Sequence, residues 1–257
     1  MDLWLLMVGL NLIRRVYAGV PLTGTPETRS ESVVNACLFS LQRALRSHPA
    51  SHAVCALDSD QPGWRRELYP DYKKNRSPMP EELRDILPDV LKAYLTVGVR
   101  SVTIPGLEAD DVIATIAKRV ADANGHVTVV STDKSFCQLI GFGVRVYDHF
   151  ADLEHDRDWT RERFGVEPEV LADLFALAGD SSLGISGVRS VGVHTAVKLL
   201  NDHATLEGVL AAAGDIAGKL GSKLRDGRED ARLAKKLVSL VIDAKLGINL
   251  RDFRFEQ

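Results

Sequence analysis

The sequence predicts an α/β fold, a mostly parallel β-sheet flanked by helices, followed by a helical C-terminal part. Two observations support this prediction. Up to about residue 160, short apolar runs that fit strands buried on both faces alternate with longer stretches of helical periodicity. After Phe164 the alternation stops, and helical periods are combined with glycine turns. We therefore expect two domains, covering residues 1–165 and 166–257.

The alternating pattern places the strands and helices of the first domain. Strands are expected at residues 3–8, 52–57, 100–104, 126–130 and 144–147, and helices at 31–46, 81–97 and 108–123. Strands that alternate with helices in this way form βαβ units and hence a parallel sheet. The whole apolar N-terminal run, residues 1–13, is interpreted as a buried strand.

Composition excludes several classes of protein. The 257 residues are 45% hydrophobic and 26% charged, which is ordinary globular usage. The 32 basic and 35 acidic residues give a net charge of −3, which excludes a broadly basic nucleic-acid coat but permits local basic patches. We expect a monomer.

Cysteine usage and the N-terminus bear on cellular location. The chain has three scattered cysteines, Cys37, Cys55 and Cys137. They are too few for a disulfide framework or a thiolate zinc site, so a reducing cytoplasm is expected. Asp2 precedes the N-terminal apolar run and Arg14 follows it, which is the reverse of a signal peptide.

Acidic side chains follow the predicted strands. The carboxyl ends of parallel strands meet at one edge of the sheet, where ligands bind. Each acid alone is explained at least as well as a helix cap or by the helix dipole. Together they would repel one another unless a cation lay between them, and oxygen ligands without His or Cys indicate Mg²⁺ or Mn²⁺. The acids are Asp58, Glu108, Asp110, Asp111, Asp133 and, in the helical part, Asp180.

Such an ion would favour phosphodiester hydrolysis, because it polarises a phosphoryl oxygen and activates bound water. The spacing within the GLEADD motif limits how the ion is held. Residues three apart share a helix face, so Glu108 and Asp111 are expected to point together, while Asp110 points elsewhere. All three therefore cannot ligate one ion directly.

Residues 64–76, WRRELYPDYKKNR, form a segment that we call the basic segment, with a net charge of +3. Its basic residues are Arg65, Arg66, Lys73, Lys74 and Arg76. The interleaved Trp64, Tyr69 and Tyr72 offer faces on which unpaired bases stack, as in a single-strand channel. A solvated loop whose aromatic rings pack into the core explains the local pattern equally well. The position directly after Asp58 favours the channel.

A second motif lies in the helical part. Gly187 to Gly192, followed by an apolar-periodic stretch, fits a helix-hairpin-helix whose backbone N–H groups face a phosphate. The alternative is an ordinary glycine turn between helices. Residues 219–236 carry seven basic residues against three acidic ones and form a second candidate surface for duplex DNA.

Together these motifs resemble the 5′-nuclease (flap endonuclease) superfamily over nearly the whole chain. They are LNLIRR at 10–15, WRRELYPDYKKNR at 64–76, SPMPEEL at 77–83, GLEADD at 106–111, STDKSFCQL at 131–139, FGVEP at 164–168 and LAGDSSLGISGVRSVG at 177–192. The resemblance implies a PIN-like nuclease domain, a helical arch or clamp, and a C-terminal helix-hairpin-helix domain on duplex DNA.

The resemblance also implies roles for particular residues. Asp110 would ligate Mg²⁺ directly, and its partners in the first metal cluster would be Asp58, Glu108 and Asp111. Asp133 and Asp180 would serve a second, weaker ion, and Lys73 and Arg76 would act at the scissile phosphate. A K⁺ ion would be held by the backbone carbonyls of Leu177, Ala178, Ser186, Val188 and Val191. DNA contacts would come from Ser190, Val191, Gly192, Val193, His194, Thr195, Arg65, Arg66, Lys73 and Tyr72.

The chain departs from the superfamily pattern at four positions. Val8, Ser135 and Leu183 stand where acids are expected, which predicts weaker metal binding. Ser190 stands where the hairpin has glycine, and serine is more strained in a left-handed backbone conformation.

The sequence thus predicts a Mg²⁺-dependent 5′ flap endonuclease that acts on branched DNA, with Mn²⁺ able to replace Mg²⁺. The main alternative is a branched-DNA-binding protein in which Val8, Ser135 and Leu183 have emptied the metal site. A weaker alternative, a phosphatase-like or response-regulator-like acidic pocket, leaves the basic segment and the hairpin unexplained.

Overall fold

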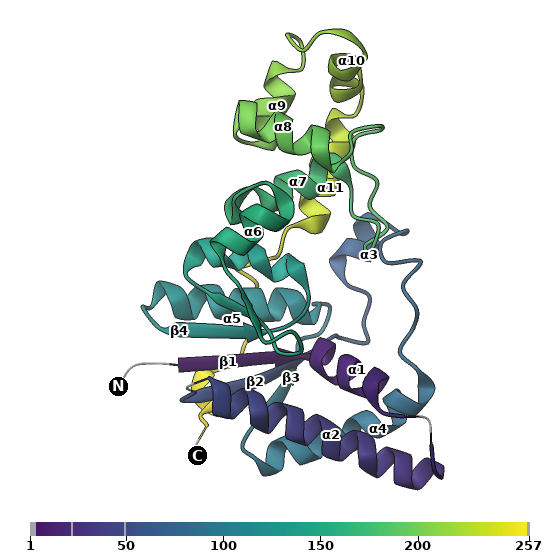
Figure 1. The fold of residues 1–257 in the computed structure, drawn as a ribbon, viewed down its shortest axis with the longest axis vertical. Coiled ribbons are helices and arrows are strands. Elements are labelled where there is room, and N and C mark those ends of the chain that lie inside the picture. Colours follow the sequence, from purple (N-terminus) through teal and green to yellow (C-terminus); the bar gives the residue numbers. More distant parts are fainter. Residues whose placement is uncertain (1–3, 22, 49, 256–257) are drawn as a thin grey trace. The chain divides into compact units, whose positions relative to one another are not determined.

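The computed structural model describes residues 4–21, 23–48 and 50–255 (Figure 1). Six strands of the described residues form one sheet in the order β3-β2-β1-β4-β5-β6. The strands are β1 (Trp4–Gly9), β2 (His52–Leu57), β3 (Arg100–Thr103), β4 (His126–Val130), β5 (Arg145–Asp148) and β6 (Leu153–His155). The pairings of β1 with β2 and β4, of β2 with β3, and of β4 with β5 are all parallel. The predicted parallel sheet is confirmed.

The order in which the chain adds strands to the sheet reverses between β1 and β4. From β1 the chain builds outward through β2 and β3, then returns to place β4 on the other side of β1. Val8 near the carboxyl end of β1 is in register with Cys55 of β2 and Val130 of β4. In an open parallel sheet, such a switch point is where ligands bind, beyond the carboxyl ends of the strands.

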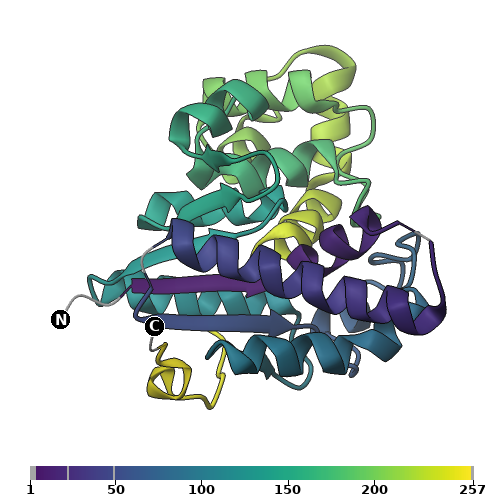
Figure 2. The ribbon, with the colours of Figure 1, turned by 60° about the horizontal axis from the view of Figure 1, so that its bottom comes forward.

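Helices cover both faces of the sheet (Figures 1 and 2). Helices α1 (Leu10–Gly19), α2 (Pro26–Ser47) and α4 (Glu81–Thr96) pack on one face, and their buried residues share a core with Leu6, Val8 and Cys55. Helix α5 (Ala109–Asp122) lies on the other face, where a Cβ on Gly9 would lie 3.4 Å from Ile113.

The N-terminal run differs from the prediction of one strand. The strand ends at Gly9 and α1 begins at Leu10, while residues 1–3 lie outside the described part. Leu10, Leu12 and Ile13 are buried in α1. Because the apolar run continues unbroken from strand into helix, its periodicity does not reveal the boundary.

The chain divides into two compact units that interleave in the sequence. The α/β unit comprises Met1–Gly63, Pro78–Glu154 and Val241–Gln257, and the helical unit comprises Trp64–Ser77 and His155–Leu240. The basic segment, which includes helix α3 (Trp64–Leu68), therefore belongs to the helical unit. The remaining helices of this unit are α6 (Arg157–Phe164), α7 (Leu171–Ala178), α8 (Val193–His203), α9 (Leu206–Ala212), α10 (Gly218–Asp226) and α11 (Arg228–Val238), with the 3₁₀ helix η2 (Pro168–Val170).

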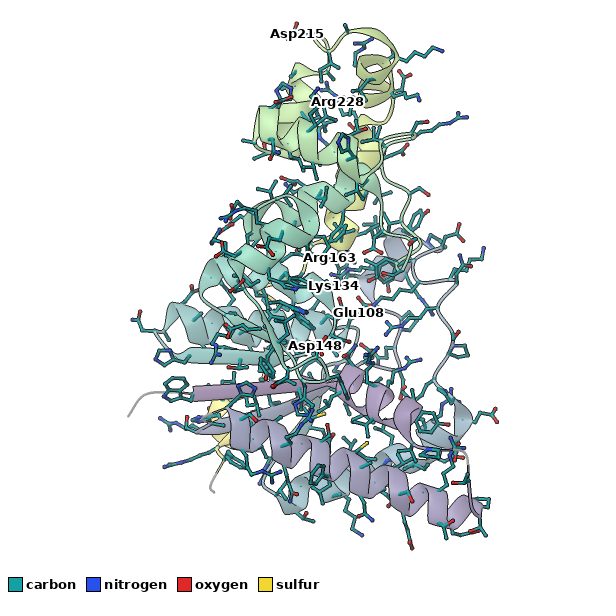
Figure 3. The ribbon with its side chains drawn as sticks, in the orientation of Figure 1. Glu108, Lys134, Asp148, Arg163, Asp215 and Arg228 are labelled. Carbon is teal, nitrogen blue, oxygen red and sulfur yellow. The ribbon has the colours of Figure 1, made fainter. Side chains whose placement is uncertain are left out.

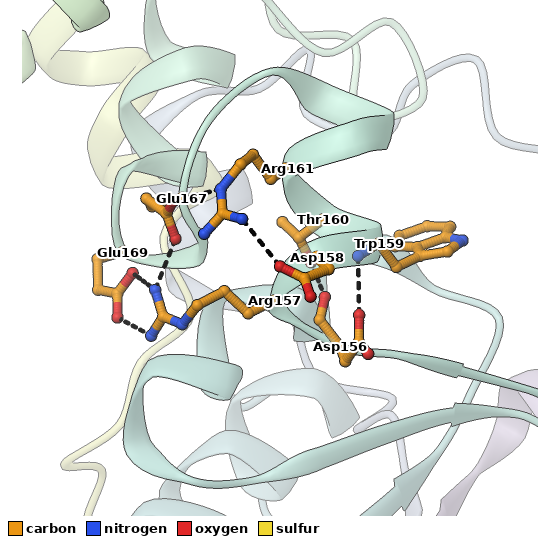
Figure 4. A network of polar contacts seen from close by, with 8 residues as sticks. All are labelled: Asp156, Arg157, Asp158, Trp159, Thr160, Arg161, Glu167 and Glu169. Atoms are coloured by element: carbon orange, nitrogen blue, oxygen red, sulfur yellow. Dashed lines mark hydrogen bonds and ion pairs between the residues drawn. The ribbon is translucent and has the colours of Figure 1, made fainter.

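A network of ion pairs joins α6 to η2 across the left-handed turn at Gly165 (Figure 4). Arg157 contacts Glu167 at 2.7 Å and Glu169 at 2.6 Å, and Arg161 contacts Glu167 at 2.6 Å. Hydrogen bonds from these arginines hold the pKa of both glutamates below its ordinary value. The pairs are exposed, so each contributes little to stability.

The β5–β6 turn carries a buried histidine that makes stability depend on pH. Arg43 of α2 donates from Nε to His149 Nε2 at 3.0 Å and from Nη2 to the His149 carbonyl at 2.6 Å. Burial, aided by the Arg43 charge, lowers the pKa of His149 to about 4. The unfolded chain then binds the proton more readily, so stability is lost as pH falls from about 6.5 toward 4.

We expect the free energy of unfolding to fall by about 2 kcal/mol between pH 7 and pH 5 from this histidine alone. Urea unfolding at the two pH values measures it. His149→Gln keeps an acceptor for Arg43 but does not titrate, so its pH dependence is expected to be smaller by that amount. An unchanged dependence in the variant would show that other groups are responsible.

Candidate functional site

The carboxyl ends of β1 and β4 are tied together by an asparagine. Asn11, in the first turn of α1, accepts from the Thr132 backbone N–H at 3.2 Å and from the Thr132 hydroxyl at 2.9 Å. Next to Thr132, Asp133 caps the 3₁₀ helix η1 (Lys134–Phe142) by accepting from the Ser135 N–H at 2.9 Å. The sequence places Asn11 in a motif but gives no sign of this bridging role, because its partner lies 121 residues away.

Asp58 follows β2 and reaches the start of α5. Its Oδ1 accepts from the Ala109 N–H at 2.9 Å, so Asp58 supplies the helix cap that the N-cap residue, Glu108, does not provide. Ser59 adds a second contact between the end of β2 and the segment before α5, because its hydroxyl accepts from the Gly106 N–H at 3.1 Å. The structure therefore brings Asp58 to the helix terminus that carries Glu108 and Asp110. Glu108 and Lys134 mark the starts of α5 and η1 in Figure 3.

The three acids at the start of α5 differ in exposure. Glu108 and Asp110 are half-buried, whereas Asp111 is fully buried. Asp111 Oδ1 accepts from the Val241 N–H at 3.0 Å, and Thr115, one turn later, donates to the Val241 carbonyl at 3.0 Å. One oxygen of Asp111 therefore secures the C-terminal segment within the α/β unit, and Asp110 is the more accessible aspartate.

The acids at this edge suit a divalent ion that keeps much of its water shell rather than one enclosed by protein ligands. Across the described ranges, no three Asp, Glu, His or Cys side chains are grouped to hold one metal ion. Asp58, Asp111 and Asp133 each have one oxygen engaged by a backbone N–H. Mg²⁺ commonly keeps several waters and binds through one or two carboxylates, which this arrangement permits.

The three residues that stand where the superfamily has acids differ in their surroundings. Val8 is 1% exposed and belongs to the core beneath α1 and α2. Ser135 donates its backbone N–H to Asp133, while its buried hydroxyl has no hydrogen-bond partner among the described residues. Leu183, in the helical unit, offers its carbonyl to the Lys73 N–H at 2.8 Å.

The basic segment is partly buried within the helical unit. Arg65 is 3% exposed, and it donates from Nε to the Leu237 carbonyl at 2.8 Å and from Nη2 to the Ser239 carbonyl at 2.7 Å. Tyr72 is also buried, whereas Arg66 and Arg76 are exposed and Lys73 is half-buried. Contact of Arg65 and Tyr72 with DNA remains a prediction, and in this structure both side chains support the segment from within.

The glycine hairpin lies in the loop between α7 and α8, and its assignment as a helix-hairpin-helix stays a prediction. The Val188 N–H donates to the Leu177 carbonyl at 2.8 Å, and the Val191 N–H donates to the Val188 carbonyl at 2.9 Å. Ser190 has φ of 64°, so the expected left-handed serine is confirmed. Gly192 and His194 are exposed at the start of α8, where no side chain caps the helix, so its first N–H groups can meet a phosphate.

Comparison with known families identifies the class of protein. Residues 4–165 match the model of the 5′-3′ exonuclease N-terminal resolvase-like domain, and residues 166–257 match that of the 5′-3′ exonuclease C-terminal SAM fold. The chain therefore belongs to the 5′-3′ exonuclease family. Within the described residues, no helix is both long and apolar enough to cross a bilayer.

Within this family, the chain is similar to named flap endonucleases over nearly its full length. The chain is 40% identical to the flap endonuclease Xni of Shewanella sp. strain W3-18-1 over 254 residues, which cover 99% of this chain and 95% of the relative. The flap endonuclease Xni of Shewanella oneidensis has the same identity and coverage.

Solved structures share the fold. The bacteriophage T5 5′-exonuclease with bound zinc superposes with a TM-score of 0.80 at 23% identity, over 93% of this chain and 90% of that one. The catalytic core of Rad2 in complex with DNA substrate gives 0.62 at 12% identity, over 99% and 83% of the two chains.

Proposed function

We propose that the protein is a structure-specific 5′ flap endonuclease that hydrolyses phosphodiester bonds in branched DNA with Mg²⁺. The proposal rests mainly on one observation. Asp58 accepts a hydrogen bond from the first residue of α5, and Glu108 and Asp110 lie at the same end of that helix. This acidic strand edge occurs in a chain that is similar along its length to proteins named flap endonuclease Xni. Mn²⁺ is expected to replace Mg²⁺, because both are hard ions that take oxygen ligands.

The proposed metal site assigns a role to five acids of the α/β unit. Asp110 would hold the ion directly, with Asp58, Glu108 and Asp111 as its partners in the first cluster, and Asp133 would assist a second, weaker ion. When bound, the ion supplies Lewis-acid polarisation of a phosphoryl oxygen and an acidified water. Lys73 and Arg76 neutralise the charge that develops on the phosphoryl oxygens.

The DNA is recognised by shape. The turn at residues 190–195, which is exposed except at Val191 and Thr195, holds duplex through its phosphates, with K⁺ bound by carbonyls of the hairpin. The basic segment contacts the single strand. Phosphate contacts position a duplex without reading base edges, so affinity is expected to fall steeply with salt and to depend little on sequence. The T5 and Rad2 structures that contain DNA support this assignment by analogy of fold.

A labelled 5′-flap duplex incubated with Mg²⁺, Mn²⁺ or EDTA tests the proposed activity. We expect cleavage with either ion and at least about 10³-fold less product in EDTA, because the ion provides several kcal/mol of transition-state stabilisation. A gel shift of the flap should persist in EDTA. An unbranched duplex of equal length is the control, and cleavage of both substrates at equal rates would contradict structure specificity.

A second candidate, a branched-DNA-binding protein without catalysis, is favoured by the burial of Val8 in the core. Its carbon side chain provides no ligand at the switch point of the sheet. The same assay separates the two, because this candidate predicts a gel shift with no product at any Mg²⁺ or Mn²⁺ concentration.

A further inference from the structure

Two segments of the helical unit that are about a hundred residues apart in sequence meet through their backbones. The Lys73 N–H donates to the Leu183 carbonyl at 2.8 Å. Next to this bond, a Cβ added to Gly184 would lie 3.0 Å from the Asp71 carbonyl oxygen, so the two chains are in close contact. The loop that leads from α7 toward α8 therefore reaches the basic segment beyond α3 (Figure 1).

Lys73 needs such support because its backbone conformation is unfavourable. Its φ is 53°, in the left-handed region, where a side chain with a Cβ is strained. Local hydrogen bonds form the turn, from the Lys74 N–H to Asp71 and from the Arg76 N–H to Lys73. A strained conformation of this kind persists only where its surroundings hold it.

The short turn that carries the Leu183 carbonyl is in turn ordered by the Asp180 side chain. One carboxylate oxygen, Oδ1, accepts from the Ser182 N–H at 2.8 Å, the Ser182 hydroxyl at 2.6 Å and the Leu183 N–H at 3.3 Å. Asp180 and Ile185 close the turn with reciprocal backbone bonds of 2.8 and 2.9 Å. We call residues 180–185 the Asp180 turn.

The other end of the basic segment is fixed independently. Arg65 is bonded to the carbonyls of Leu237 and Ser239, and its guanidinium lies 4.5 Å from the centroid of the Trp64 ring. Arg65 therefore anchors the start of the segment at the C-terminal end of α11, while the Asp180 turn contacts the segment at Lys73.

We propose that Asp180 is a positioning residue that fixes the backbone of Lys73 by ordering the turn whose Leu183 carbonyl accepts the Lys73 N–H. The proposal rests on the proposed function, in which Lys73 acts at the phosphoryl group. It also differs from the metal-ligand role that the sequence predicts for Asp180. The contact with Lys73 uses the backbone of residue 183, so a leucine serves there as well as an acid.

Two substitutions at Asp180 separate the roles, because asparagine keeps an Oδ1 acceptor but loses the charge that a metal ligand needs. If Asp180 positions Lys73, Asp180→Ala is expected to lower the single-turnover cleavage rate at a saturating concentration of flap DNA by about 10²-fold, which is the effect of misplacing a catalytic group. The Kd for flap DNA should change little. Asp180→Asn should retain most of the activity. In a variant that already carries Lys73→Ala, Asp180→Ala should lower the cleavage rate little further, because both substitutions remove the same contribution of Lys73.

Amide hydrogen exchange gives a measurement independent of activity. The Lys73 amide is expected to lose at least about tenfold of its protection in Asp180→Ala and to keep it in Asp180→Asn. Asp202→Ala, which removes an exposed aspartate of α8, is the control for loss of charge in the same unit. If Asp180→Ala fails to fold, Gly184→Ala takes its place, since its Cβ would press on the Asp71 carbonyl.

Two results would contradict the positioning role of Asp180. Asparagine and alanine variants that are equally inactive, with Lys73 protection unchanged in both, would overturn the proposal in favour of metal ligation. Unchanged protection in Asp180→Ala would overturn it whatever the activity. If the wild-type protein does not cut flaps but the exchange pattern is as expected, the positioning role stands and the proposed function fails.

Discussion

Replacing Asp110 by asparagine is expected to reduce flap cleavage by at least about 10³-fold while leaving flap affinity nearly unchanged. Asp110 is the aspartate of the α5 terminus that is half-buried rather than fully buried. In the proposed site it is the direct ligand, so its loss removes an ion worth several kcal/mol in the transition state. Duplex binding through the hairpin does not use this carboxylate.

Cleavage is measured by single-turnover kinetics on a labelled flap, and binding by gel shift in EDTA. Asp122→Asn is the matched control, since Asp122 lies at the other end of α5 and contacts Lys118 at 2.6 Å. That exposed pair contributes little to stability, so this variant should cut at the wild-type rate. Undiminished cutting by Asp110→Asn would refute the assignment of the metal ligand, and a parallel loss of binding would indicate misfolding.

The sheet was predictable because its central strands consist mostly of apolar residues. The predicted strands at 52–57 and 126–130 have the same bounds in the structure, and the acids that follow them lie at the carboxyl edge. Parallel pairing makes the common position of these acids predictable from sequence alone, because all strands of a parallel sheet end at the same edge. The left-handed conformation of Ser190 was predictable for a similar reason, since the hairpin motif specifies its backbone.

Long-range contacts of individual side chains were not predictable. Asp111 and Val241 are 130 residues apart, and Arg65 and Leu237 are 172 residues apart. Arginine and aspartate are read from sequence as exposed or functional, because burial costs them hydration unless partners compensate. Here backbone groups compensate, so Arg65 stabilises the helical unit and Asp111 stabilises the α/β unit, each from within. Periodicity contains no information about such partners.

Replacing Gly187 by alanine is expected to destabilise the helical unit by about 3 kcal/mol, a large effect for one methyl group. A Cβ on Gly187 would lie 2.3 Å from the Gly179 nitrogen and 2.3 Å from the Leu177 carbonyl oxygen. Both are backbone atoms, so no side-chain rotation relieves the clash. The neighbouring bond from the Val188 N–H to Leu177, which fixes the hairpin, would have to break or stretch.

Urea unfolding followed by far-UV circular dichroism measures the loss, and a gel shift with flap DNA should show weaker binding, because the hairpin provides the phosphate contacts in the proposed mode of DNA binding. Gly214→Ala is the matched control, since a Cβ at Gly214 meets no atom within 4 Å. It makes the same chemical change in the same unit, and its stability should stay within about 0.5 kcal/mol of wild type. If the two variants unfold alike, close approach of the backbones at Gly187 does not govern the stability of the hairpin.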